Sequence, residues 1–586
     1  MDKHIVNDPR LLALEAAQGL ARTRPGLLVD PKNRIITREH DHVGIVSGGG
    51  SGHEPSFGGM VGRGLLSTAV AGNIFASPNV GQIRRGIQLA NKGKGVLIII
   101  MRYTGDVLHF GLAKEQSSVS HPDVPTHLLI VGDDVAVPRS QGSITGRRGL
   151  AGTVLVHKVA GSAAAQGKDF DSVKRIASLV SERIGTIGSG LGHCSLPGST
   201  GSGDDHHLKS DEIEIGMGIH NEPGVKTMKL PKTPELIRLM LDYITMTTDP
   251  ERSFLPFKND GTDEVVLLVN NLGGLSEMEL SAIAGEALLA LEERGIKVVR
   301  VGAGRYMTSI NLPGFSLTLL LLPREDDNKV SASDIVSLLD APTDAPGWIS
   351  IFEPRSVDAL TIQDEHEGET LVKNSGSPVS YDYTSFERAL DAACRHVIEA
   401  EPEITRFDTI AGDGDCGTCC PRSITEILRL LQSGEVDKKD LISAIATLAE
   451  GIERVMDGTS GALYSIWMNA LAGGFTNAGS ASSAAWSKAL SHALSSLCDY
   501  TNARPPSRTL MDPLFAFTES FASDQNLAQA VVAANRSTEE TKNIQAKAGR
   551  AAYVGQDQLK DAKVPDPGAF GVSKILEGIQ SVIGKQ

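Results

Sequence analysis

The sequence predicts an α/β unit followed by an all-helical unit, and three observations lead to this fold class. Up to about Trp348, short apolar runs alternate with helical stretches, a pattern typical of α/β architecture. A stretch rich in proline, glycine, serine and acidic residues then interrupts the pattern between Thr343 and Ser380. From Tyr383 onward, apolar residues recur every three or four positions, the period of a helix that buries one face. At 586 residues, the chain is long enough for several domains with separate cores.

Six apolar runs are expected to be strands of the N-terminal half. They read HVGIVS, GVLIIIM, THLLIVG, VVLLVNN, IKVVRVG and LTLLLLP. Apolar runs that alternate with helical stretches are typical of parallel strands joined by crossover helices. The range 276–294 is predicted to be one such helix between two strands. Its apolar residues keep helical spacing at Leu280, Ile283, Leu288 and Leu291.

The interruption after the last apolar run predicts a linker between two domains, because its composition suits a flexible connection. We therefore expect an N-terminal α/β domain over residues 1–346, a linker over 347–380 and a helical domain over 381–586. Helical spacing in the last range is clearest in FERALDAACRHVIEA, KKDLISAIATLAEGIERVM and LAQAVVAANRSTEETKNIQAKAGRAAYV.

Charge and hydrophobicity argue against several classes of partner. The net charge is −15 and no dense run of lysine and arginine appears, so a nucleic acid partner is not expected. No stretch reaches the roughly 18 to 20 apolar residues that cross a bilayer, and MDKHIVNDPR does not read as a signal peptide. We therefore expect a cytoplasmic protein without a membrane partner.

The six cysteines do not form the pattern of a disulfide framework. Three stand isolated and are expected to be buried or idle thiols: Cys194, Cys394 and Cys498. Cys416, Cys419 and Cys420 form a CxxCC cluster without a second pair at zinc-finger spacing. A metal or redox role and an incidental place in a loop both stay open for this cluster.

A glycine-rich turn, SGGGSGHEP at 47–55, directly follows the first apolar run. Its glycines permit close backbone approach, so N–H groups can converge on a substrate oxygen. The spacing matches neither a Walker loop nor GxGxxG, and a plain strand-to-helix turn is the alternative. His53 at the end of the turn favours a site.

Two further loops place a titratable residue just beyond a predicted strand. GVLIIIMRYTGD ends in Asp106, and IEIGMGIHNEPG contains His220. Such positions commonly line the ligand crevice of an α/β protein. A histidine in this position can equally be a hydrogen-bonded structural residue, and the pattern alone leaves this open.

Three aspartates lie close together in FDTIAGDGDCGT, at Asp408, Asp413 and Asp415. Such carboxylates repel one another unless a hard cation neutralises them, and Mg²⁺ is the usual cation where nucleotide phosphates complete its shell. A calcium EF-hand does not fit, because its twelfth position counted from Asp413 is Ile424 and not glutamate. Glycine-rich turns at 456–464 and 565–571 are candidate phosphate sites or plain connections between helices.

Together these segments resemble the single-chain ATP-dependent dihydroxyacetone kinases, in which a K-type substrate domain precedes an L-type nucleotide domain. The resemblance covers nearly the whole chain. It rests on SGGGSGHEPSF, AGNIFASP, YTGDVLHFGLA, GRRGLAGTVLVHKVAG, GMGIHNEPG, GDGDCGT, DGTSGALY and DPGA, in that order. It implies a substrate domain of two α/β subdomains, an antiparallel helical barrel that binds ATP, and a homodimer whose two domain types face each other across subunits.

By this resemblance, His220 adds to the C2 carbonyl of the triose as a hemiaminal, while Asp106 and His53 handle protons of the hydroxyl that attacks ATP. An imidazole, with a pKa of about 6.5 in solution, offers a lone pair at neutral pH. A covalent tether selects carbonyl compounds over glycerol. The implied substrate-binding residues are Gly52, His53, Glu54, Pro55, Ser56, Met101, Asp106 and His220.

In the helical domain the resemblance assigns two magnesium ions to Asp408, Asp413 and Asp415. The implied nucleotide-binding residues are Asp415, Cys416, Gly417, Thr418, Ser460, Gly461, Thr509, Leu510, Asp566, Pro567 and Gly568. The chain departs from the family pattern at two places. Met101 stands where many relatives have lysine, and RPPSRTLMD at 504–512 replaces the usual Gly-Asp before Arg-Thr.

These residues predict a kinase that uses ATP and Mg²⁺ to phosphorylate dihydroxyacetone, and also glyceraldehyde. Two alternatives stay open. The helical domain could cleave FAD to a cyclic flavin phosphate and AMP, as animal relatives do with manganese. A nucleotide-loaded regulator is the non-enzymatic alternative, and fusion of both half-sites in one chain argues against it.

Overall fold

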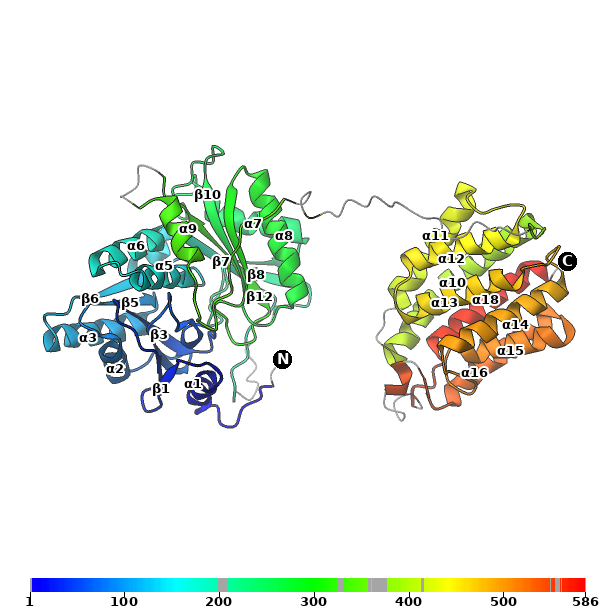
Figure 1. Cartoon of the computed structure of the whole chain (residues 1–586), viewed down its shortest axis with the longest axis horizontal. Helices are drawn as coiled ribbons and strands as arrows, with labels where there is room; N and C mark the ends of the chain where they lie inside the picture. Colours follow the sequence, from blue (N-terminus) through cyan, green and yellow to red (C-terminus); the bar gives the residue numbers. More distant parts are fainter. Residues whose placement is uncertain are drawn as a thin grey trace. The chain divides into compact units, whose positions relative to one another are not determined.

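The computed structural model describes residues 3–198, 208–324, 330–356, 360, 377–412, 416–548, 550–553, 559 and 561–584. At 143–145, 416–420, 550 and 553 it describes the backbone alone. The chain divides into two compact units, Met1–Ile362 and Gln363–Gln586 (Figure 1). No helix among the described residues has the length and apolar character needed to cross a membrane.

The first unit contains two six-stranded sheets, and the first sheet has the strand order β1-β2-β4-β3-β5-β6. Its strands are β1 (Leu28–Asp30), β2 (Ile35–Thr37), β3 (Gly44–Ser51), β4 (Thr68–Ile74), β5 (Val96–Met101) and β6 (Thr126–Val131). The four strands from β4 to β6 are parallel, whereas β1 and β2 add an antiparallel edge. The carboxyl ends of β3 and β5 therefore point to the same edge, where α/β proteins bind ligands.

Helices cover both faces of this sheet. α2 (Val80–Ala90) and α3 (Thr104–Ser120) pack on one face through apolar residues such as Ile83 and Phe110. α5 (Thr153–Ala165) and α6 (Phe170–Glu182) pack on the other face, within the largest apolar core. Three further helices precede the second sheet in the described chain: α1 (Leu12–Thr23), the short η1 (Gly58–Met60) and α4 (Arg139–Thr145).

The second sheet has the order β11-β10-β12-β7-β8-β9. Its strands are β7 (Ile184–Gly190), β8 (Glu212–Ile215), β9 (Lys226–Lys229), β10 (Glu264–Asn271), β11 (Lys297–Gly304) and β12 (Gly314–Leu321). α7 (Thr233–Thr245) and α8 (Glu277–Glu293) cover one face, and α9 (Ala332–Asp340) packs into the core shared with the first sheet.

All six predicted strands are present, but the expectation of parallel strands is wrong for most of the second sheet. Among the paired strands that the structure describes in this sheet, only β10 and β11 are parallel, and the helix that joins them is α8. β12 runs antiparallel to both β10 and β7, and β8 and β9 continue antiparallel. The reason is the connection 305–313, which has no helix: a parallel return needs a crossover, whereas a short turn reverses the chain.

The helix predicted over 276–294 is confirmed as α8. Ser276 accepts a hydrogen bond from the backbone N–H of Glu279, whose side chain accepts from the Ser276 N–H in return. This capping box satisfies two of the free amides at the helix start and fixes where α8 begins.

The second unit is all-helical, as predicted. Its long helices are α10 (Tyr383–Ala411), α11 (Cys416–Ser433), α12 (Leu441–Val455), α13 (Gly458–Gly474), α14 (Ser483–Tyr500), α15 (Met511–Asp524), α16 (Leu527–Glu540) and α18 (Pro567–Ile583). Each packs against the next along the chain, and α18 packs against α10, so the ring closes on itself (Figure 1). Because consecutive neighbours run antiparallel, the starts of α11, α13, α15 and α18 gather at one end with the C-terminus of α10.

The helical spacing predicted over 527–554 is interrupted in the structure. α16 ends at Glu540, and the 3₁₀ turns η3 (Thr541–Asn543) and η4 (Arg550–Tyr553) follow. The Thr541 hydroxyl donates to the Thr538 carbonyl and accepts from the Asp566 N–H, while the Thr538 hydroxyl donates to the Ala569 carbonyl. These bonds tie the end of α16 to the start of α18, which the local sequence pattern does not reveal.

Candidate functional site

The structure brings together two histidines that lie far apart in the sequence. The Nε2 atoms of His53 and His220 are 3.0 Å apart, and their rings meet edge to face with centroids 4.8 Å apart. His53 follows β3 and is buried, whereas His220 follows β8 and keeps 21% of its side chain exposed. The pair joins loops from both sheets of the first unit.

Two aromatic rings hold the histidine pair in place. Phe75 stacks on His53 with centroids 5.1 Å apart, and it meets His220 edge to face at 4.8 Å. Tyr103 also meets His220 edge to face, with centroids 4.7 Å apart. Such edge contacts restrict the ring of His220 to one orientation. Neither aromatic residue was predicted from the sequence, although Tyr103 stands in the motif that contains Asp106 and Phe75 stands in AGNIFASP.

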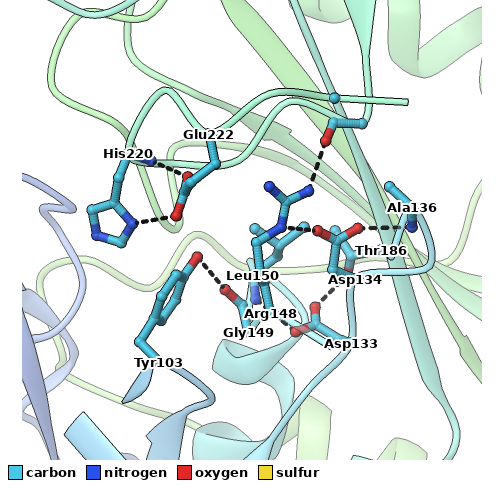
Figure 2. A network of polar contacts seen from close by, with 12 residues as sticks. Tyr103, Asp133, Asp134, Ala136, Arg148, Gly149, Leu150, Thr186, His220 and Glu222 are labelled. Carbon is cyan, nitrogen blue, oxygen red and sulfur yellow. Dashed lines mark hydrogen bonds and ion pairs between the residues drawn. The ribbon is translucent and has the colours of Figure 1, made fainter. Parts of the chain in front are cut away.

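Glu222 binds His220 twice (Figure 2). Its Oε1 lies 3.0 Å from the ring Nδ1, and its Oε2 accepts the backbone N–H of His220 at 2.8 Å. Burial raises the pKa of Glu222, but the hydrogen bonds and charge of His220 outweigh it and lower this pKa to about 2. An ionised carboxylate only accepts, so Nδ1 of His220 carries the proton and Nε2 faces His53. Sequence reasoning missed Glu222 as a separate residue.

A second ion pair supports the loop of His220 from behind (Figure 2). The Arg148 Nε donates to Asp134 at 2.7 Å, and its Nη2 donates to the carbonyl of Gly216 at 2.7 Å. The neighbouring Asp133 accepts the backbone N–H groups of Leu150 and Gly152, so it anchors the start of α5. The segment GRRGLAG thus connects the strand end of β6 to the loop that presents His220.

His53 is fixed from the opposite side. Its Nδ1 lies 2.9 Å from the carbonyl of Thr308. A carbonyl only accepts, so Nδ1 of His53 carries a proton. Burial, and then the charge on His220, lower the pKa of His53 to about 3 although the Thr308 hydrogen bond raises it. No sequence motif marks Thr308, because its contribution is a backbone carbonyl.

Asp106 lies in the first turn of α3 and is 5% exposed. Its Oδ1 is buried without a hydrogen-bond partner among the described residues. Burial raises the pKa of Asp106 to about 6, against the opposing effects of the Ser77 hydrogen bond and the charges of His220 and His109. A buried acceptor that lacks a donor costs free energy and is expected where a ligand supplies the donor.

The other predicted substrate residues surround the histidine pair to different degrees. Gly52 has a φ of +106°, and a side chain there would overlap the ring of Phe75. Its N–H donates to Glu54 at 2.9 Å, and Pro55 follows, while the Ser56 hydroxyl donates to the carbonyl of Tyr306. Met101 is different, since its side chain lies in the apolar core and packs over Gly149.

In the helical unit, the described nucleotide-site residues lie at one end of the ring. Ser460 and Gly461 begin α13, Thr509 and Leu510 precede α15, and 566–568 begins α18. A side chain at Gly461 would come within 1.9 Å of the Met456 carbonyl, and one at Gly568 would contact Leu510 at 3.3 Å. Helix starts leave N–H groups free and favour anions, so this end suits phosphates.

Arg508 adds a cation to that end which sequence reasoning did not single out. It is 1% exposed, its Nη2 donates to the carbonyl of Val564, and its Nη1 has no partner among the described residues. Burial raises the pKa of Asp566 to about 6, although the charge of Arg508 and the N–H of Ala569 lower it.

The metal prediction is only partly within the described residues. Asp408 is buried in the last turn of α10, and its Oδ1 lies 2.5 Å from where a side chain at Gly412 would begin. Its carboxylate is thus directed at the turn that follows α10, and its oxygen donors suit Mg²⁺. Asp413 and Asp415 lie outside the described residues, as do the side chains of Cys416 and Thr418, while Gly417 is described by its backbone alone. Within the described ranges, no three His, Cys, Asp or Glu residues form a group that could hold a metal.

A cleft of about 740 Å³ runs along α13 beside α14. Of the predicted nucleotide residues whose side-chain positions are described, only Gly461 lines it, together with residues such as Ser465, His492 and Tyr500. The cleft is large enough for a small-molecule ligand. Apart from Gly461, however, the residues that line the cleft are not the predicted nucleotide residues at the helix starts.

Comparisons with known proteins match both units. A family described as the Dak1 domain matches residues 18–347, and the DAK2 domain matches 410–581. The dihydroxyacetone kinase of Komagataella pastoris is 40% identical and is matched over 97% of this chain and 96% of its own. Dihydroxyacetone kinase 1 of Saccharomyces cerevisiae is 39% identical, and the human triokinase/FMN cyclase 35%, each with 99% of both chains covered.

Solved structures give the same result for the fold. The dihydroxyacetone kinase of C. freundii in its native form matches with a TM-score of 0.65 and 28% identity, covering 99% of this chain and 100% of the other. The structure of that enzyme in complex with AMP-PNP and Mg²⁺ matches with a TM-score of 0.64 at the same identity and coverage. The chain therefore belongs to the dihydroxyacetone kinase family, with a Dak1 domain followed by a DAK2 domain.

Proposed function

We propose that this protein transfers the γ-phosphate of ATP to a hydroxyl of dihydroxyacetone, and also of glyceraldehyde. One observation carries the proposal: among the described residues, a buried carboxylate oxygen of Asp106 lacks a donor, in a site where the charge of His220 acts on this carboxyl. A triose hydroxyl supplies that donor. The relatives that cover this chain from end to end are kinases of the same substrate class by name.

The proposed substrate complex is a hemiaminal on Nε2 of His220. Glu222 occupies Nδ1, so Nε2 is the nitrogen available to the C2 carbonyl. Nε2 also faces His53, which is positioned to exchange a proton with the carbonyl oxygen. Glycerol has no carbonyl carbon and cannot form this bond, so the tether selects trioses over the corresponding alcohol.

Asp106 is the proposed base for the attacking hydroxyl. With a pKa raised to about 6, it is ionised at neutral pH and is a stronger base than an ordinary aspartate. Holding the hydroxyl beside this carboxylate supplies the positioning that phosphoryl transfer chiefly requires.

ATP and two magnesium ions are proposed to bind at the ring end formed by the starts of α11, α13, α15 and α18. Asp408, Asp413 and Asp415 would hold the metal, which neutralises the charge of the transferred phosphoryl group when bound. Backbone from 416–418, with Ser460 and Gly461, would bind phosphates. Thr509, Leu510 and the turn 566–568 would contact the nucleoside. Nη1 of Arg508, which has no partner in the described part of the chain, would add a donor near Asp566.

The remaining expectations are proposals of the same kind. We propose a cytoplasmic homodimer in which the substrate domain of one subunit meets the nucleotide domain of another. The domain limits proposed are 1–346, 347–380 and 381–586. The family matches, at 18–347 and 410–581, support separate functional units on either side of the linker.

Coupled ATP turnover with dihydroxyacetone tests the proposal. His220→Ala and Asp106→Asn are expected to lose at least about 100-fold in kcat/KM, the usual contribution of an acid–base group. His121→Ala, at the far end of α3, is the matched control and should keep wild-type activity. Full activity in both active-site variants contradicts the assignment.

A second candidate activity has a specific observation in its favour. The relatives from human, mouse and cattle are named triokinase/FMN cyclase and are 35% identical over nearly the whole chain. The helical unit would then cleave FAD to cyclic FMN and AMP with a metal at the same aspartates. Incubation with FAD and Mn²⁺, followed by separation of the flavin products, decides this, and absence of the cyclic product removes the candidate.

A further inference from the structure

We propose that Glu222 is a positioning residue for covalent capture of the substrate: it holds a proton on Nδ1 of His220 and balances the positive charge that addition leaves on that ring. The inference rests on the proposed hemiaminal. It concerns a residue to which the sequence resemblance gave no role, and it follows from the contacts of the histidine pair.

Counting protons in the pair gives the first step. Three contacts connect the two rings to their surroundings and to each other. Nδ1 of His53 contacts the Thr308 carbonyl, Nε2 of His53 contacts Nε2 of His220, and Nδ1 of His220 contacts Glu222. Each contact needs one ring proton, because the carbonyl and the ionised carboxylate only accept. Two neutral imidazoles carry two protons between them. The pair therefore carries a third proton and a single positive charge. Because burial and the charge of His220 lower the pKa of His53 to about 3, this proton rests on Nε2 of His220, the ring that contacts Glu222.

The third proton has a use in the covalent step. When it moves across the 3.0 Å contact to Nε2 of His53, Nε2 of His220 has its lone pair free for the C2 carbonyl carbon. The new N–C bond forms as the carbonyl π bond breaks, and its electron pair moves to the oxygen. That oxygen takes the proton from His53 and becomes a hydroxyl. His53 is then neutral, and His220 is a cation with Nδ1–H still bound to Glu222.

The step conserves atoms and charge, so no proton enters from solvent. It begins with one positive charge on the pair and ends with one on His220, beside the same carboxylate. Carboxylate support of a reacting histidine through its second nitrogen follows the same logic as in the serine-protease triad. Without Glu222, the alkylated ring would hold its charge in a partly buried site without a counter-ion.

Other charged groups around His220 do not replace Glu222. Asp106 on α3 faces the site but is bound to the proposed hydroxyl, and Tyr103 offers a ring edge. Arg148 is already paired with Asp134 and lies on the far side of Glu222. A side chain at Gly218 would touch both Arg148 and Glu222, so a cation lies close to the carboxylate and favours its ionised form.

Carbon-13 NMR with dihydroxyacetone labelled at C2 tests the inference on the full-length protein. In the wild type, the bound ketone signal should give way to that of a tetrahedral carbon. Glu222→Gln should weaken adduct formation by roughly 10- to 100-fold, the range seen when carboxylates that orient metal-bound histidines are removed. Glu214→Gln is the matched control, because Glu214 binds the N–H of Gly224 in the same loop without contacting His220. It should keep the wild-type affinity.

Nitrogen-15 NMR of labelled histidines gives a second readout that a merely structural role would not change. The wild type and Glu222→Asp, which keeps the charge, should show three ring protons on the pair, and Glu222→Gln should show two. An adduct of wild-type affinity in Glu222→Gln, or the same proton count in both Glu222 variants, overturns the inference. Absence of any adduct in the wild type overturns the proposed hemiaminal instead, so the two failures are distinguishable.

Discussion

At the scale of single residues, the substrate site is organised around groups whose protonation the fold dictates. Glu222, with a pKa of about 2, is kept ionised, and His53, with a pKa of about 3, is kept neutral. The pKa of Asp106 is raised to about 6. Burial acts on all three, and the hydrogen bonds and neighbouring charges decide the final direction.

The motifs revealed His53, Asp106 and His220, because their positions follow predicted strands. They did not reveal Thr308, which acts through a backbone carbonyl, and they gave no role to Phe75, although it lies in the motif AGNIFASP.

Activity should fall as the pH drops through about 6, because protonated Asp106 cannot accept the hydroxyl proton. A pH profile of kcat/KM checks this, and the acidic limb should disappear in Asp106→Asn, whose residual activity has no such base. A limb unchanged in that variant would assign the titration to another group.

Asp106 should also reduce stability at neutral pH. Its folded-state pKa of about 6 lies above the ordinary value of 3.8, so the folded protein binds more protons than the unfolded chain between these pH values. The favourable contribution of this carboxyl is therefore present below about 3.8 and is lost as the pH rises through about 6. Asp106→Asn should raise the free energy of unfolding at pH 8 by roughly 1 to 3 kcal/mol, measured by denaturant titration without substrate. A loss of stability in this variant would contradict the argument.

At the scale of elements, the pattern within one segment predicted whether a helix or a strand forms there. How the strands pair and where the helices end depended on contacts between segments. The six apolar runs are strands and 276–294 is a helix, because burial imposes periods of about 2 and 3.6 on such segments. The antiparallel course of β12 and the early end of α16 were not predicted. The antiparallel course of β12 follows from a connection that contains no helix. The end of α16 is set by threonine hydroxyls that form hydrogen bonds with the start of α18.

The joint between α5 and α9 should respond to high pH. Buried Lys158 on α5 donates to Ser162 and to the carbonyls of Leu338 and Ala341, at the end of α9. Burial lowers its pKa from 10.5 to about 8, so the unfolded chain binds more protons between these pH values and stability rises with pH across them. Relative to Lys158→Met, the wild type should gain roughly 2 to 3 kcal/mol from pH 8 to 10. Parallel curves for the two proteins would refute this.

Closure of the helical ring depends on close approach between α10 and α18. A side chain at Gly578 would come within 2.5 Å of the Cα of Ala393, so Gly578→Ala should cost about 1 to 3 kcal/mol of stability. Gly571→Ala on the same helix meets only ordinary contacts at 3.9 Å or more and serves as the control. It should be neutral or stabilising, since alanine favours a helix. Thermal or denaturant unfolding followed by circular dichroism measures the stability of both variants. Equal losses of stability in Gly578→Ala and Gly571→Ala would contradict the packing argument.

At the scale of the whole molecule, two units with separate cores carry the two halves of the proposed site. Differential scanning calorimetry should therefore resolve two transitions. Dihydroxyacetone is expected to raise only the transition of the first unit, and ATP with Mg²⁺ only that of the second, because a ligand stabilises the unit that binds it. Removal of Mg²⁺ by a chelator should abolish the second shift. One transition that responds to both ligands would contradict independent units.

The contact between the first and last helices of the ring has a practical consequence. Since α10 begins and α18 ends at the same pole, both covalent connections of this unit leave from the pole opposite the helix starts that are proposed to bind the phosphates. An affinity tag or fluorescent protein fused after Ile583 would therefore leave nucleotide entry unobstructed. The same proximity makes this unit a good candidate for circular permutation, with the old ends joined by a short peptide and new ends opened in a connecting turn.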